Sequence, residues 1–290
     1  MKSRSDWVSI SDLKCFSRVG RMFCLLTAYF DESYNDRTLC VGGWLCDDDT
    51  WKHIELKWAA RIEYERRISA LKGLKPLTRY HASDCANHKR EFEGWSRDRQ
   101  ILLTKKLLSI LGVFKPFGVA AGVSFNELKS AFPNLKTKKD IEWEAYKLCM
   151  QSCFVQIGDT MAHEIPYERV TIIHDQGKGT FNGAALSAFE DMDAAKKFPN
   201  KKYFVTIAPG SAEKFIALQS ADLIAYEGMK LTDAHKRGKL DFRKSMEAII
   251  GHRIPITAGY LRADGLHELA ELGLILPGAR PVSSSKKRTP

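Results

Sequence analysis

The stretch Leu25-Leu26-Thr27-Ala28-Tyr29-Phe30-Asp31-Glu32-Ser33 decides the fold class, because an apolar run leads directly into two adjacent carboxylates. Such a run predicts a buried strand, and open α/β sheets bind ligands beyond the carboxyl ends of their strands. A second apolar run, residues 170–173, ends in the same way at His174 and Asp175. Asp and Ser are also common turn residues. We expect Asp31, Glu32 and Asp175 to lie at one edge of a sheet, either in a site or in ordinary turns.

A third acid, Asp222, lies on a helix that the sequence predicts over residues 212–237. At about 100° per residue, Leu218, Ala225 and Met229 fall within roughly 60° of Asp222, so its side chain points toward the core. A carboxylate in that position is costly unless it is paired, protonated or bound to a metal. The ordinary explanation is a buried ion pair or a helix-capping contact, but no Lys or Arg lies three or four positions away.

Composition favours a packed globular protein with a polyanionic partner. The chain has 290 residues, 44% of them hydrophobic, with a formal net charge of +10 and a pI near 9.2. This charge favours nucleic acid, although a plain basic surface would explain it equally well. Seven cysteines without a C-x-x-C pair suggest a reduced compartment, and no apolar run approaches the roughly 18 residues of a membrane span. We therefore expect a cytoplasmic protein.

Alternating strand and helix patterns predict an α/β layer fold. We divide the chain into a polar extension (1–21), a main domain (22–238), a C-terminal α/β extension packed on it (239–278) and a disordered basic tail (279–290). The expected strands include 23–30, its hairpin partner 38–46, and 203–207. A helix over 47–70 carries Lys and Arg on the face opposite its apolar residues.

Four segments in this order resemble one known family: Asp31-Glu32-Ser33, His81-Ala82-Ser83-Asp84, Asp175, and Leu218-Gln219-Ser220-Ala221-Asp222-Leu223-Ile224-Ala225-Tyr226. They are similar to the family catalogued as domain of unknown function 3800. The likeness runs from about Phe23 to Tyr226, and departs at Tyr34, where members commonly have Gly. It implies a ribonuclease H-like fold, in which a mixed sheet flanked by helices carries clustered acids on central strands and on a late helix.

The resemblance also implies a mechanism. Ribonuclease H-like nucleases hold two Mg²⁺ or Mn²⁺ ions about 4 Å apart around the scissile phosphate. In this chain Asp31 would bridge the ions, while Asp175 and Asp222 would each complete one ligand shell. Glu32 is the candidate fourth acid, but adjacent strand residues point to opposite faces, so it joins Asp31 only if the strand ends or bulges there.

His81 has several possible roles. It could position water, protonate the leaving group, hold a metal, or make only structural hydrogen bonds. His81, Cys85 and His88 also form H-x-x-x-C-x-x-H, which on a helix could bind zinc, although no fourth ligand is evident.

Metal-dependent nuclease activity is thus the leading expectation, and two alternatives stay open. The first is an inactive nucleic-acid-binding or adaptor module. A pure binder has no need of acids that repel phosphate, which counts against it. The second is a hydrolase of small phosphorylated molecules that uses the same acids. A broad basic groove would favour polymers and a closed pocket small molecules.

Overall fold

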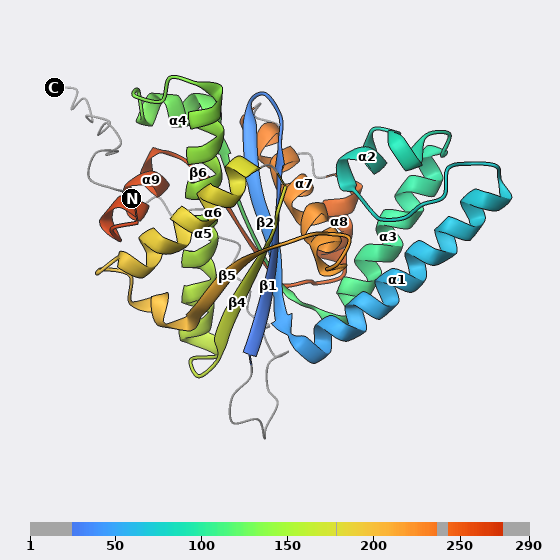
Figure 1. The fold of residues 1–290 in the computed structure, drawn as a ribbon, viewed down its shortest axis with the longest axis horizontal. Coiled ribbons are helices and arrows are strands. Elements are labelled where there is room, and N and C mark those ends of the chain that lie inside the picture. The colour runs from blue at the N-terminus through green and yellow to red at the C-terminus, as the bar shows by residue number, and fades with distance from the viewer. Residues whose placement is uncertain (1–24, 178, 237–242, 275–290) are drawn as a thin grey trace.

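A six-stranded mixed sheet with helices on both faces forms the molecule (Figure 1). The computed structural model describes residues 25–177, 179–236 and 243–274, so the expected extension 1–21 and tail 279–290 lie outside the described residues. The strands are β1 (Leu25–Tyr34), β2 (Thr38–Asp47), β3 (Phe117–Ser124), β4 (Arg169–Asp175), β5 (Phe204–Gly210) and β6 (Ile256–Leu261). Their order across the sheet is β5-β4-β1-β2-β3-β6. The expected α/β architecture is therefore confirmed.

The helices described are α1 (Asp48–Leu71), α2 (Ala82–Ala86), α3 (Arg97–Phe114), α4 (Phe125–Ala131), α5 (Lys138–Glu164), α6 (Gly179–Ala194), α7 (Ala217–Lys236), α8 (Lys244–Gly251) and α9 (Ala263–Glu271), with short 3-10 helices η2 (Arg90–Phe92) and η3 (Pro199–Tyr203). None of these helices is long and apolar enough to cross a membrane. The five described cysteines are free and buried.

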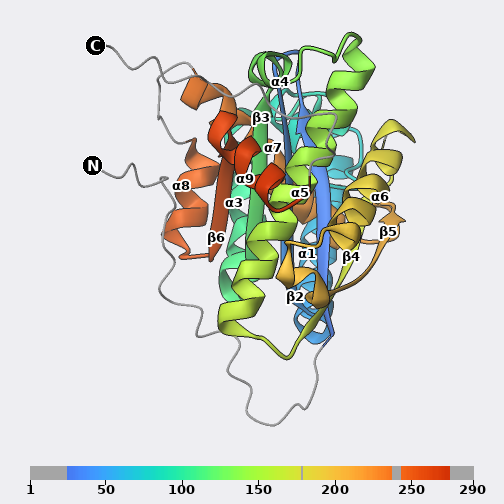
Figure 2. The same ribbon diagram turned by 90° about the vertical axis from the view of Figure 1, so that its left-hand side faces the viewer.

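Two cores lie on opposite faces of the sheet because side chains alternate along its strands. On one face, Phe30 and Val41 pack against α5 and α6. Figure 2 views this face, with α5 lying along the sheet. On the other face, Tyr29 and Trp44 pack against α7, α1 and α3. A side chain on β1 therefore meets one helical layer or the other according to its place in the alternation.

Strand β1 is longer than expected. It continues through the acidic motif to Tyr34, and pairs with β2 in unbroken antiparallel register, Asp31 opposite Gly42 and Glu32 opposite Val41. The expectation that the strand ends before Asp31 is wrong. Pairing with β2 supplies backbone hydrogen bonds that outweigh the turn preference of the acidic residues.

Gly42 lets α7 lie close on the sheet. A Cβ at this position would lie 2.8 Å from the backbone nitrogen of Ala225, which is closer than real Cβ atoms approach. The register is continuous here, so the glycine serves close packing and not a bulge. Because Gly42 is the cross-strand partner of Asp31, this contact brings the turn of α7 that carries Asp222 toward Asp31.

The remaining elements extend this frame. Helix α1 begins at an N-cap formed by Asp47, whose carboxylate accepts the N–H of Thr50 at 2.9 Å. Its buried stripe, which includes Trp51 and Trp58, faces the core that contains α7. Beyond residue 243, the chain forms α8, β6 and α9, and β6 pairs in parallel with β3. The C-terminal segment therefore adds a strand to the same sheet.

Candidate active site

Asp31 lies on the α7 face of β1, and the negative charges of three other acids affect it. Its Oδ1 accepts the N–H of Glu32 at 2.7 Å. Burial raises the pKa of Asp31 well above its ordinary value, and the negative charges of Glu32, Asp222 and Asp175 raise it further. Acids from two strands and a helix therefore act electrostatically on Asp31, and a proton or a cation would relieve their repulsion.

Asp175 ends the neighbouring strand β4 on the same side. Its Oδ2 accepts the N–H of Gly177 at 3.0 Å. A Cβ at Gly177 would lie 3.4 Å from that oxygen and 2.8 Å from Oε1 of Glu32. The absence of a side chain at Gly177 keeps the space beside these two carboxylates open.

Asp222 is buried, with 5% of its surface exposed. Its Oδ2 accepts the N–H of Ala82, in the first turn of α2, at 2.6 Å. Burial raises the pKa of Asp222, and Asp175 adds to that effect, while His81 and the Ala82 N–H oppose it. The helix-capping contact that offers an ordinary explanation for this acid is therefore present, and the charge of Asp175 acts on the same carboxyl.

The residues around Asp222 fasten α7 to the segment that carries His81. Oε1 of Gln219 accepts the indole N–H of Trp58 at 3.1 Å and the backbone N–H of Tyr80 at 2.9 Å. The carbonyl of Ser220 accepts the indole N–H of Trp44 at 2.8 Å. The motif at 218–226 therefore has a structural function that is separate from the charge of Asp222.

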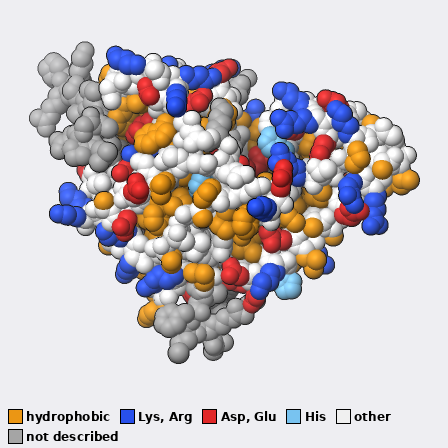
Figure 3. Space-filling model, viewed as in Figure 1, with side chains coloured by type: hydrophobic (Ala, Val, Ile, Leu, Met, Phe, Trp, Pro, Cys, Tyr) orange, Lys and Arg blue, Asp and Glu red, His pale blue; other side chains and the backbone are white. Residues whose placement is uncertain are grey.

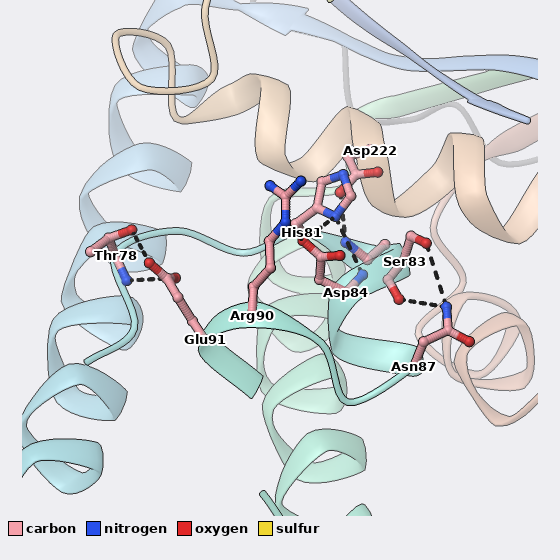
Figure 4. Close-up of polar contacts among 9 residues, drawn as sticks. Thr78, His81, Ser83, Asp84, Asn87, Arg90, Glu91 and Asp222 are labelled. Atoms are coloured by element: carbon pink, nitrogen blue, oxygen red, sulfur yellow. Dashed lines mark hydrogen bonds and ion pairs between the residues drawn. The ribbon is translucent and has the colours of Figure 1, made fainter. Parts of the chain in front are cut away.

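His81 lies at the N-cap of α2, between Asp84 and Asp222 (Figure 4). Its Nδ1 is 3.1 Å from Oδ2 of Asp84, and Nε of Arg90 is 3.5 Å from the same oxygen. The His81 side chain is 42% exposed and that of Asp84 only 13%. A carboxylate that holds one ring nitrogen fixes the orientation of the imidazole and leaves its other nitrogen for a ligand.

Glu32 lies on the other face of the sheet. Because β1 neither ends nor bulges at Glu32, the condition for it to join Asp31 on one face is not met. On this face Glu32 acts on Tyr146 of α5. Burial is the largest cause that raises the pKa of Tyr146, and the negative charge of Glu32 is the next. The Tyr146 hydroxyl is buried without a hydrogen-bond partner among the described residues. The sequence shows Tyr146 only as one apolar residue of a predicted helix. Periodicity does not reveal that Glu32 of another element acts on its hydroxyl.

In the described part of the chain, no three His, Cys, Asp or Glu side chains are arranged as a ready metal site. This includes the zinc alternative: Nδ1 of His88 contacts the carbonyl of Trp95 at 3.1 Å, while Cys85 is buried beside Tyr80 and Thr104. His81, Cys85 and His88 thus have separate partners.

Basic and acidic side chains alternate along α1. Along α1, five Lys and Arg residues are matched by five acids. Glu63 pairs with Arg66 at 2.7 Å and with Arg67 at 2.8 Å. Figure 3 shows basic and acidic side chains interspersed over the face in view. The Lys and Arg residues expected on α1 are present, but four of the five pair with acids about one turn away, which reduces the positive charge of this helix.

No protein-family model matches this chain, and no curated protein is similar to it. The likeness to the domain of unknown function 3800 therefore depends on the four quoted motifs alone. The chemistry that can be assigned to the chain depends on the geometry around Asp31.

Proposed function

We propose that the protein is a metal-dependent hydrolase of phosphodiester bonds in nucleic acid, built on a ribonuclease H-like sheet. The observation that carries the proposal is that Asp31 is a buried carboxyl whose pKa is raised by burial and by the negative charges of Glu32, Asp222 and Asp175, which come from β1, α7 and β4. Acids from β1, β4 and α7 that repel one another around a buried carboxyl are costly unless a function requires them. The sheet supports the fold assignment, since it is mixed, flanked by helices, and carries acids on adjacent central strands and on a late helix.

The donor chemistry fits Mg²⁺ or Mn²⁺, since carboxylate oxygens are the ligands these ions prefer. Asp31, Asp175 and Asp222 would hold the cation, after side-chain rotations that bring their oxygens together. A bound cation would activate water and stabilise the leaving oxygen. Glu32 starts from the opposite face, and its Oε1 lies beside Gly177, so it adds negative charge at the end of β4.

His81 supplies the proton chemistry in this proposal. Nδ1 of His81 accepts the backbone N–H of Asp84 at 3.3 Å and lies 3.1 Å from its carboxylate, so in this tautomer Nε2 carries the proton and is the atom that would donate to the leaving oxygen or to a water. Asp222 has a second role, because its hydrogen bond to the Ala82 N–H fixes the start of α2, which His81 caps. One carboxylate thus positions the histidine and contributes charge to the acids.

Two alternatives use other observations. A cavity of about 710 Å³ beside His81 favours a hydrolase of small phosphorylated molecules. Charge pairing along α1 weakens a pure nucleic-acid-binding module, because such a module would depend on free cations.

The test is cleavage of labelled single- and double-stranded DNA and RNA with Mg²⁺, Mn²⁺ or EDTA, beside Asp31→Asn. We expect metal-dependent products from the parent protein and none from the variant. If no polymer is cut but p-nitrophenyl phosphate is hydrolysed, the small-molecule alternative replaces the proposal. If neither is cut and polynucleotide binding depends steeply on salt, the binding module replaces it.

A further inference from the structure

The acids leave one cavity unexplained, which lies between α1, the segment before α2, η2 and the residues that lead into α7. Its volume of about 710 Å³ is within the usual range for small-molecule sites. His81 and Asp84 form part of its wall, as does Gln219, one helical turn before Asp222. The cavity therefore adjoins the candidate active site.

Hydrogen bonds and an ion pair hold the wall of the cavity in place. The backbone N–H and the hydroxyl of Thr78 donate to the Glu91 carboxylate at 3.0 and 2.6 Å (Figure 4), and Lys75 pairs with Glu93 at 2.6 Å. These contacts fasten the segment before α2 to η2. A wall held in this way keeps the opening in shape without a ligand.

Most charged side chains of the lining already have partners. Arg66 pairs with Glu63 at 2.7 Å, while Arg90 and His81 both face Asp84. Glu91 accepts its two hydrogen bonds from Thr78. These groups are largely neutralised before any ligand enters.

Two charged residues remain, one of each sign. Among the described residues, the side chains of Arg79 and Glu213 make no hydrogen bond or ion pair, and both line the cavity. Ile62, Ile216 and Phe92 supply apolar surface beside them. A ligand that fits has an anionic group, a flat apolar body, and a hydrogen-bond donor at a distance from the anion.

We propose that this cavity binds one nucleotide unit. Arg79, a guanidinium suited to bidentate contact, meets the phosphate. The base lies on the apolar wall, and Glu213 accepts a hydrogen bond from an exocyclic amino group, as carboxylates do from cytosine N4. This deepens the proposed function by giving it a nucleotide-binding subsite next to the acids. Binding alone does not require those acids, so the two proposals fail separately.

The test is calorimetric titration of the full chain in EDTA with CMP, UMP and cytidine. We expect CMP to bind with a Kd below about 1 mM and cytidine at least tenfold more weakly, because a charge-assisted pair is lost. UMP has the same size but no amino group, so it should bind more weakly than CMP. Failure of CMP to bind at 10-fold higher concentration (about 10 mM) would overturn the proposal.

Variants locate the binding. Arg79→Ala should weaken CMP about tenfold and leave cytidine unchanged, while Arg97→Ala, at an exposed position outside the cavity, should change neither. Ala59→Phe places a ring in the cavity and should abolish both, whereas Ala60→Phe, exposed on the same helix and absent from the lining, should not. Unchanged CMP binding in both Arg79→Ala and Ala59→Phe would overturn the site even if one variant proved unstable.

Two further measurements separate nucleotide binding in the cavity from cleavage by the acids, and a strand end from a free nucleotide. Asp31→Asn should bind CMP as tightly as the parent protein does. Loss of cleavage in this variant with unchanged CMP binding would show that the acids and the cavity have separate roles. A 5′-phosphorylated oligocytidylate that displaces CMP, where its 5′-hydroxyl form does not, identifies the occupant as a strand end. If neither displaces CMP, the occupant is the free nucleotide. Both outcomes support the cavity as a nucleotide site.

Discussion

Oδ2 of Asp222 accepts the backbone N–H of Ala82 at 2.6 Å, so a candidate metal ligand also fixes the first turn of α2. His81 caps that turn, and Asp84 within it contacts the histidine. Any change at Asp222 therefore has two separable effects. One is on the charge of the acidic cluster, and the other is on the position of His81.

Asn and Ala at Asp222 separate these effects. Asp222→Asn keeps an oxygen that can accept the Ala82 N–H, whereas Asp222→Ala leaves that buried donor unsatisfied. We expect Asp222→Ala to be less stable than Asp222→Asn by about 1–3 kcal/mol. Urea unfolding in EDTA measures the difference. Equal stability would mean that the hydrogen bond contributes nothing.

The contact between Gly42 and α7 gives a second prediction. A Cβ in Gly42→Ala would press on the backbone of Ala225 and push α7 outward, which should cost about 1–3 kcal/mol and move Asp222 away from Asp31. Gly251→Ala is the control, since a Cβ there meets nothing within 4 Å. Denaturant midpoints of both variants test this. The contact is unimportant if the two variants unfold alike.

The raised pKa of Asp31 predicts how stability depends on pH. A folded-state pKa above the ordinary 3.8 means that this group stabilises the fold below its unfolded pKa and that the contribution is lost as pH rises through the folded pKa. Metal-free Asp31→Asn should therefore gain stability relative to the parent as the pH rises above about 4. Urea unfolding of both proteins in EDTA at a series of pH values from about 4 upward measures the difference. A constant difference would contradict the raised pKa.

His81 and Asp84 form a pair whose removal should reduce cleavage more than stability. His81→Gln should lower the rate by about 100-fold and change the free energy of unfolding by no more than about 1 kcal/mol, since it caps only α2. Asp84→Asn should lower the rate less, by loosening the ring. His88→Gln is the control, because His88 is exposed and its ring contacts the Trp95 carbonyl, outside the His81–Asp84 pair. A full rate in His81→Gln removes the histidine from the mechanism.

The sequence predicts much of this fold because local patterns decide it. Apolar periodicity in α1 and the stripe around Asp222 in α7 depend on residues three or four apart, and both helices bury the expected faces. The predicted end of β1 is wrong, because the acidic motif is turn-forming by composition, yet pairing with β2 extends the strand to Tyr34. The face of Glu32 follows from that pairing.

The cavity depends on contacts that a pattern does not contain. Arg79 and Glu213 are 134 positions apart in the sequence, and only the docking of α7 beneath the segment before α2 makes them line one space. Gln219 is visible as part of a motif, but its bonds to Trp58 and Tyr80 are not. Long-range packing of this kind requires coordinates.

The most direct test of the central claim, that Asp31, Asp175 and Asp222 hold a divalent cation, is the melting temperature of the parent protein and of Asp31→Asn with Mn²⁺, Mg²⁺ or EDTA. A ligand that binds only the folded state raises the melting temperature, and at 100 times its Kd it adds about 2.7 kcal/mol. We predict a rise of several degrees with Mn²⁺ in the parent and none in Asp31→Asn. Melting curves of the parent that are the same in Mn²⁺, Mg²⁺ and EDTA would contradict the account.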